Sequence, residues 1–125
     1  MPSFYEWILS RLEVTAGSAL LDIATGAGTL VKYAARRGAD AVGIDISIAA
    51  IRKAKADHAA LNIPLADGES LPFKSEHFDF VTNIGSLEHF LHPEKGLSEM
   101  NRVLKKSGKA GIFVPNSYSL GDILT

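Results

Sequence analysis

Residues 19–31 read ALLDIATGAGTLV and place an apolar run directly before a glycine-rich turn. A short apolar run of this kind is typical of a strand buried on both faces of a parallel sheet. Gly26 and Gly28 permit a tight turn and a close approach of the backbone to a ligand. Apolar residues then recur at helical spacing, at Leu30, Val31, Ala34 and Ala35. The stretch therefore predicts the strand, turn and helix of an α/β fold.

Asp22 interrupts the apolar run near its carboxyl end. A carboxylate is costly to bury unless a cation or a hydrogen-bond donor meets it, and a ligand can supply that group. The turn at Gly26 and Gly28 leads into a helix N-terminus, which favours negative charge. A zwitterionic ligand, with its cationic group near Asp22 and its anionic group near the helix, would suit both features.

A second apolar run, residues 41–45, ends at Asp45. Asp45 follows Gly26 at about the spacing at which such an acid binds ribose hydroxyls. The alternative is a helix cap or turn aspartate, but Ser47 already stands where it can cap the following helix. Two bound hydroxyl groups are therefore the favoured interpretation.

Two classes of cofactor are compatible with this layout. The dinucleotide fingerprint requires a third small residue where this chain has Val31, and it offers no reason for an acid at Asp22. An NAD-binding oxidoreductase is therefore the less favoured alternative.

Residues 21–29 (LDIATGAGT) resemble motif I of the class I S-adenosylmethionine-dependent methyltransferases, type 11-like, and residues 42–45 resemble their next motif. The resemblance extends from about residue 20 to residue 116. It implies S-adenosylmethionine as the cofactor, S-adenosylhomocysteine as the product and no metal. It also implies cofactor contacts from two segments: Asp22, Ala24, Gly26 and Gly28 at the methionyl end, and Asp45 and Ile46 beyond the second strand.

Two later segments extend the resemblance. Residues 67–73 (DGESLPF) resemble the segment in which an acid contacts the adenine amino group and the next backbone N–H contacts the ring, which would assign adenine recognition to Asp67 and Gly68. The alternative is a simple polar turn. Residues 78–82 resemble the fourth motif, and the loop after them implies that Asn83 and Gly85 lie beside the methyl group.

His89 is the candidate general base, because it follows this loop and a histidine side chain can accept a proton. Glu88 is the neighbouring alternative, and a capping or packing role for the segment remains open. Methyltransferases that act on exocyclic or amide nitrogens commonly carry Asn/Asp-Pro-Pro-aromatic here, whereas this chain has residues 83–86 as NIGS. Such substrates are therefore not expected.

The predicted fold is a doubly wound, Rossmann-like α/β domain over residues 1–125, with strand order 3-2-1-4-5 and flanking helices. The strands are expected at residues 19–23, 41–45, 63–66, 78–82 and 109–114, after an amphipathic helix that begins with a capping box at Ser3. Pro64 suits the third strand because that strand lies at the sheet edge. The family architecture adds a sixth strand and an antiparallel seventh, and no complete strand is predicted in residues 117–125. We therefore expect a truncated domain whose fifth strand has an exposed edge and forms a homodimer contact.

The composition excludes several classes of function. The chain of 125 residues is 46% hydrophobic and 22% charged, with a net charge of −1, so it has no global attraction for nucleic acid or an anionic membrane. It has no cysteine and no apolar run long enough to span a membrane, and residues near its start lack the basic and long apolar segments expected of a signal peptide. The expectation is a cytoplasmic methyltransferase that acts on a small molecule by in-line displacement. A non-catalytic S-adenosylmethionine-binding module is the alternative.

Overall fold

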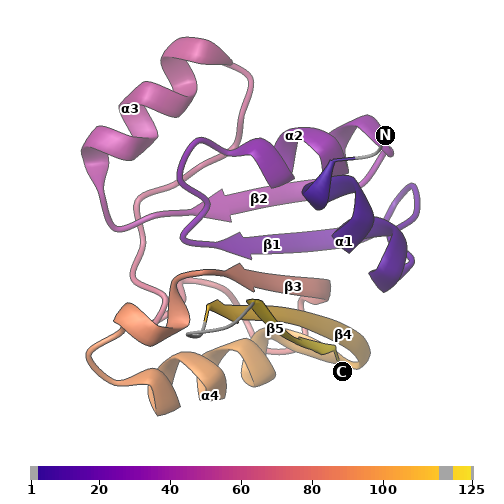
Figure 1. Ribbon diagram of the computed structural model, residues 1–125, viewed down its shortest axis with the longest axis vertical. Coiled ribbons are helices and arrows are strands. Elements are labelled where there is room, and N and C mark those ends of the chain that lie inside the picture. Colours follow the sequence, from indigo (N-terminus) through magenta and orange to yellow (C-terminus); the bar gives the residue numbers. More distant parts are fainter. Residues whose placement is uncertain (1–2, 116–119, 125) are drawn as a thin grey trace.

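The apolar run before the glycine turn forms an interior strand of a five-stranded sheet, with strand order β2-β1-β3-β4-β5 (Figure 1). The computed structural model describes residues 3–115 and 120–124. Its strands are β1 (Ala19–Ile23), β2 (Asp40–Ile44), β3 (Phe78–Ile84), β4 (Leu104–Pro115) and β5 (Leu120–Leu124). The first four strands pair in parallel, and β5 pairs antiparallel with β4. The predicted α/β class and the order of the four parallel strands are confirmed.

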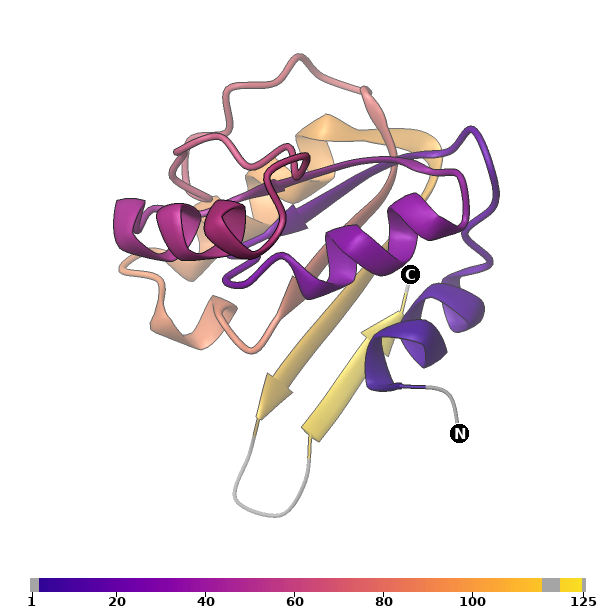
Figure 2. The same cartoon turned by 90° about the horizontal axis from the view of Figure 1, so that it is seen from above.

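Helices cover both faces of this sheet. They are α1 (Phe4–Leu12), α2 (Thr29–Arg36), α3 (Ile48–Asp57) and α4 (Pro93–Val103), with a short 3-10 helix η1 (Leu87–His89). Figure 2 shows α1 and α2 on one face and α4 on the other. The predicted caps are confirmed, because the Ser3 hydroxyl accepts from the Glu6 N–H and the Ser47 hydroxyl accepts from the Ala50 N–H. Within the described ranges, no helix has both the length and the apolar character that crossing a bilayer demands.

Each face of the sheet has its own apolar core. The core on the face covered by α1 and α2 contains Ile8, Leu9, Leu12, Leu20, Leu30 and Ala34. The core on the face covered by α4 contains Leu21, Ile23, Val81, Met100 and Val103. Each fully buried aliphatic side chain contributes about 1.5–3 kcal/mol. Because these four strands run parallel, the loops that follow their carboxyl ends lie at one common edge of the sheet.

The predicted third strand is reduced to a single parallel bridge between Asp45 and Leu65, so the expectation of a full strand at residues 63–66 is wrong. The segment nevertheless lies beside β2, where the predicted order places it. The Gly43 N–H donates to Asn62 O at 3.0 Å, and the Ala66 N–H donates to Asp45 O at 3.0 Å. Between these two bonds Pro64 has no N–H to donate, and the ladder is interrupted there.

The carboxyl-terminal part of the sheet also differs from the prediction. The fifth predicted strand, β4, begins directly after α4 and shows a register shift between the pairs Phe78–Leu104 and Phe80–Lys109. The absence of any strand in residues 117–125 is contradicted, because β5 pairs with β4 from Gly111 to Pro115. The free edge on which the homodimer was expected is therefore occupied along those residues. Asn116, where the family resemblance was expected to end, lies outside the described residues.

Candidate functional site

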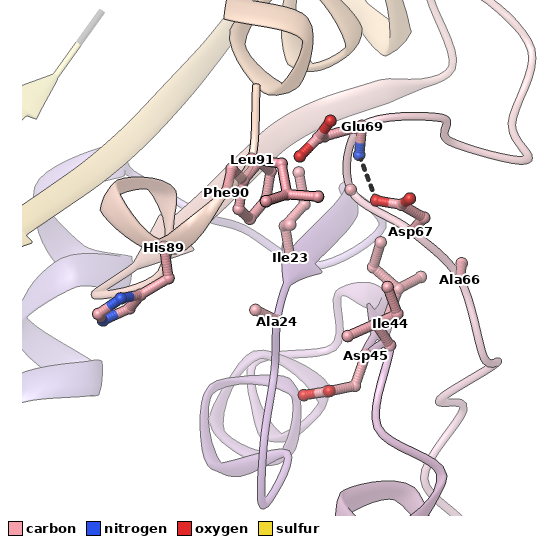
Figure 3. A pocket seen from close by; sticks show the side chains of 12 residues that line it. Ile23, Ala24, Ile44, Asp45, Ala66, Asp67, Glu69, His89, Phe90 and Leu91 are labelled. Atoms are coloured by element: carbon pink, nitrogen blue, oxygen red, sulfur yellow. Dashed lines mark hydrogen bonds between the residues drawn. The ribbon is translucent and has the colours of Figure 1, made fainter. Parts of the chain in front are cut away.

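A cavity of about 210 Å³ lies at the carboxyl edge of the sheet (Figure 3). Four separate segments line it: residues 23–24 after β1, 44–46 after β2, 66–69, and 89–91 beyond β3. Six of the predicted site residues are among its lining residues: Ala24, Asp45, Ile46, Asp67, Gly68 and His89. Carboxyl edges of open α/β sheets are where such folds bind ligands, so this cavity is the candidate site.

The glycine turn adopts a backbone that few other residues tolerate. Gly28 caps α2 with φ +75°, and a Cβ atom there would lie 2.8 Å from Leu61 Cδ1. Gly26 has φ +58°, and its N–H donates to Asp45 Oδ2 at 3.0 Å. The turn is therefore fixed against the end of β2, although neither glycine lines the cavity.

Asp45 is half-buried at the rim of the cavity and accepts two backbone hydrogen bonds. Its Oδ2 receives the Gly26 N–H, and its Oδ1 receives the Ser47 N–H at 2.9 Å. Asp45 therefore does have the turn role that was the alternative interpretation of this aspartate. Because each carboxylate oxygen accepts about two hydrogen bonds, both oxygens retain capacity for ligand hydroxyls.

Asp22 is buried, with 4% of its surface exposed, and two side-chain hydroxyls bond it. Thr25 Oγ1 donates to Oδ2 at 2.7 Å, and Thr82 Oγ1 donates to Oδ1 at 2.8 Å. Burial raises the pKa of Asp22 from 3.8 to about 6, the two hydroxyls oppose this rise, and the Asp45 carboxylate adds to it. The protein itself thus supplies the donors that the sequence analysis sought from a ligand. Both threonines were missed, although Thr82 stands out as a polar residue in an apolar strand.

Asp67 forms a tight polar turn, which is the alternative that the sequence left open. Its Oδ1 accepts from the Glu69 N–H at 2.9 Å, and its backbone carbonyl accepts from the Ser70 N–H at 3.0 Å. Figure 3 shows the carboxylate turned toward Glu69. Any adenine contact would therefore come from the remaining capacity of that carboxylate or from the backbone of Gly68.

The ring of Phe90 packs between two glycines that lie far apart in the sequence. A Cβ atom on Gly68 would lie 2.6 Å from Phe90 Cζ, and one on Gly96 would lie 2.6 Å from both Phe90 Cδ2 and Cε2. Phe90 lines the cavity beside Leu91, whose side chain is 88% exposed. Sequence reasoning missed both residues; the available signal was a glycine inside a predicted helix, at Gly96.

The remaining predicted residues lie on the β3 side. Asn83 is buried; its Oδ1 accepts from the Ser86 hydroxyl, and its Nδ2 lies 3.9 Å from Met100 Sδ. Gly85 has φ +70°, and its N–H donates to Phe113 O at 2.8 Å. Neither lines the cavity. His89 is exposed at the rim, and its imidazole points away from the other labelled side chains (Figure 3).

Comparison with known proteins identifies similar chains over most of this sequence. A family described as "Methyltransferase domain" matches residues 21–112. The demethylmenaquinone methyltransferase of Renibacterium salmoninarum is 32% identical over 102 residues, which cover 82% of this chain and 43% of the relative. The ubiquinone/menaquinone biosynthesis C-methyltransferase of Bordetella avium is 34% identical over 108 residues, covering 81% and 42% respectively.

The solved structure of the PH0226 protein from Pyrococcus horikoshii superimposes with a TM-score of 0.77 at 30% identity, and the match covers 87% of this chain and 53% of that one. The chain thus spans less than half the length of the curated relatives and about half of this structural neighbour. The family match to residues 21–112 contains the glycine turn and the four segments that line the cavity.

Proposed function

Because the chain belongs to the methyltransferase domain family, we propose that it binds S-adenosylmethionine in the cavity at the carboxyl edge of the sheet and takes part in methyl transfer to a small molecule. The observation that carries this proposal is the convergence of Ala24, Asp45, Ile46 and Gly68 on one cavity. The dinucleotide alternative has no comparable support, since the family match is to methyltransferases.

The residues around the cavity fit the parts of this cofactor. The Asp45 carboxylate keeps acceptor capacity for ribose hydroxyls beyond its two backbone bonds. The side chains of Ile23, Ile44 and Phe90 provide apolar walls for the adenine ring. The start of α2 at Gly28 presents backbone N–H groups to a carboxylate, as helix N-termini do for anions.

The chemistry that the bound cofactor supplies is an electrophilic methyl group on a sulfonium. The protein's part is then to hold donor and acceptor in line, and such alignment contributes on the order of 7 kcal/mol or more when the geometry is ideal. Ile46 and Phe90 line the cavity with apolar surface. His89, exposed at the rim, is the residue proposed to take a proton from the acceptor.

The acceptor is proposed to be a quinone-type aromatic ring that is methylated on carbon. The relative from Renibacterium salmoninarum is named as a demethylmenaquinone methyltransferase, and the relative from Bordetella avium is named as a ubiquinone/menaquinone biosynthesis C-methyltransferase. The mouth of the cavity offers apolar surface to such a ring, because Ile46 is 71% exposed and Leu91 is 88% exposed. Scattered apolar residues are ordinary on surfaces, but these two adjoin one opening.

Binding without catalysis is the second candidate. It is favoured by the side chain of Asn83, which contacts Ser86 and Met100 and does not line the cavity. A binding module would need the cavity but not His89.

Isothermal titration calorimetry with S-adenosylhomocysteine, and with NAD as a comparison ligand, tests the cofactor. We expect binding of S-adenosylhomocysteine alone, weakened about tenfold to a hundredfold in Asp45→Ala because hydrogen bonds to a charged group are lost. Asp57→Ala, which removes an exposed carboxylate on α3, is the matched control and should bind as the unaltered chain does. Selective NAD binding, or unchanged affinity in folded Asp45→Ala, would overturn the proposal.

Methyl transfer from radiolabelled S-adenosylmethionine to a demethylated quinol separates the two candidates. Activity that falls in His89→Gln while S-adenosylhomocysteine affinity is kept supports the enzyme. Binding with no transfer to the quinol supports the module.

A further inference from the structure

Three neighbouring strands place three residues side by side at one level of the sheet. Asp22 on β1 pairs with Gly43 on β2 and with Thr82 on β3. Directly paired residues of parallel strands project to the same face. The side chain of Thr82 therefore points into the same layer as the Asp22 carboxylate, and Gly43 leaves that layer open on the other side.

Thr25 fills the space that Gly43 leaves. A Cβ atom on Gly43 would lie 2.7 Å from Thr25 Cβ and 2.8 Å from Thr25 Oγ1. From this position the Thr25 hydroxyl donates to Asp22, and the Thr25 N–H donates to Ile44 O at 2.9 Å. The first residue of the glycine turn is thereby fixed to both β1 and β2.

Thr82 holds the carboxylate from the other side. Thr82 has 0% exposure, and its hydroxyl donates to Asp22 Oδ1 at 2.8 Å. Thr82 Oγ1 also lies 3.5 Å from Leu21 O. Thr82 directly precedes Asn83 and the loop that carries Gly85 and His89. One buried carboxylate thus joins the glycine turn to the strand that leads to the opposite side of the cavity.

We infer that Thr82 is a positioning residue of the cofactor site, which acts through Asp22 and Thr25 to hold the glycine turn at a fixed place relative to β3. The inference rests on the proposed cofactor site and adds to it a residue that lines no part of the cavity.

The physical reason is the cost of an unpaired acceptor in a buried place. Thr82→Val keeps the shape of the side chain but leaves Asp22 Oδ1 without its donor, and such a buried group is expensive. The charged neighbour Asp45 opposes ionisation of Asp22 and cannot replace the hydroxyl. Asp22 then takes up a proton at a higher pH, and the carboxylate that orients Thr25 is lost.

The test combines two measurements on Thr82→Val, Thr82→Ser and the unaltered chain. Carbon-detected NMR follows the titration of the Asp22 carboxyl group, and calorimetry follows S-adenosylhomocysteine affinity from pH 5 to pH 8. In Thr82→Val we expect the Asp22 midpoint to rise by about one pH unit. The affinity profile should shift to higher pH with it, and a one-unit shift from about 6 corresponds to a loss of about fivefold at pH 6 and about twofold at pH 7. Thr82→Ser, which keeps the hydroxyl, should match the unaltered chain. Thr15→Val, at an exposed position, is the control for removing a threonine hydroxyl.

A folded Thr82→Val with an unchanged Asp22 titration and an unchanged affinity profile would overturn the inference. So would a loss of affinity that Thr82→Ser shares. Should Thr82→Val fail to fold, Thr25→Val removes the other donor at a half-buried position and must produce the same two shifts. If the unaltered chain binds no S-adenosylhomocysteine, the proposed function fails. The Asp22 titration then decides the hydrogen-bonding part of the inference separately.

Discussion

At the scale of single residues, Asp22 carries an electrostatic cost that the fold must offset. It is buried at the centre of the sheet, its hydrogen-bond donors are the uncharged hydroxyls of Thr25 and Thr82, and its pKa is raised to about 6. Buried carboxylates without a cationic partner favour their neutral form. The residue therefore makes the stability of the protein depend on pH in the mildly acidic range.

Between pH 4 and pH 6 the folded chain holds a proton on Asp22 that the unfolded chain, with its ordinary pKa of 3.8, releases. The contribution of this group to stability is therefore fully present below about pH 4 and is lost as the pH rises through about 6. The loss amounts to about 3 kcal/mol at 1.36 kcal/mol per pKa unit. Urea unfolding across this range should show the decline in the unaltered chain and its absence in Asp22→Asn.

Two other acids act in the opposite direction. The hydrogen bond from the Ala19 N–H lowers the pKa of Asp79, and the hydrogen bond from Arg102 lowers the pKa of Glu99. The contributions of Asp79 and Glu99 to stability are lost as the pH falls below about 4. They are the same in the unaltered chain and in Asp22→Asn. Asp57→Asn, which alters an exposed carboxylate, should keep the decline. A decline of equal size in Asp22→Asn would contradict the assignment.

Asp22 and the two serine caps could be identified from the sequence because each rule involves neighbours within a few positions, and Asp45 could be identified because it follows the glycine turn at a characteristic spacing. The partners of Asp22 were beyond such rules. Thr82 lies sixty positions away and meets Asp22 only through the register of β1 against β3. Which polar group faces another across a sheet depends on assembled geometry, and spacing along the chain does not encode it.

At the scale of elements, helix α4 holds the long segment between the β2 edge and β3. Arg102 donates to the carbonyls of Phe73 and Leu71 at 2.8 and 3.1 Å, and the Leu71 N–H donates to Glu99 Oε1 at 2.7 Å. Arg102 and Glu99 also bond one another at 2.6 Å. These bonds attach residues 71–73 to α4, directly after residues 66–69, which line the cavity without forming a regular strand.

The packing of the Phe90 ring between Gly68 and Gly96 is the second contact that joins α4 to the cavity. In Gly96→Ala the new Cβ would meet two ring carbons at 2.6 Å and Leu87 Cδ1 at 3.3 Å. We expect overpacking to lower the free energy of unfolding by about 1–3 kcal/mol, whereas the higher helix propensity of alanine raises it by about 1 kcal/mol. Chemical denaturation measures the net loss.

Phe90→Leu in the Gly96→Ala background should recover part of that loss, because the smaller side chain leaves space for the new Cβ atom. Ser98→Ala, at an exposed position of the same helix, should change stability little. Strict additivity of the Gly96 and Phe90 substitutions would show that the ring does not depend on the glycine.

At the scale of the whole molecule, β5 pairs with the edge of β4 that was predicted from the sequence to be exposed. Gly111–Pro115 pairs with Leu120–Leu124, so the backbone groups of β4 on that side have partners. A variant that ends at residue 115 should expose this edge and associate as its concentration rises, since unpaired strands bind one another. Light scattering during size-exclusion chromatography measures this, with the full chain as the control. A variant that stays monomeric throughout would contradict the role given to β5.

Most of the sheet followed from the sequence because its strands are apolar runs that meet by simple connection rules. Its two edges did not follow. At one edge, a single proline decided between a strand and a bridge at residues 63–66. At the other, β5 pairs antiparallel with β4, although residues 120–124 (LGDIL) contain no apolar run that would predict a strand. Edges are held by few contacts, so local pattern constrains them least.

The four wall segments of the cavity come from positions as far apart as residues 23 and 91, and each is held by a different strand end or helix. No part of the chain contains the cavity before the sheet has assembled, so a ligand that fills it binds the folded state alone. Such a ligand raises the free energy of unfolding by mass action, about 2.7 kcal/mol at a concentration one hundred times its Kd. The supply of its own ligand would thus set how long this chain survives proteolysis in a cell.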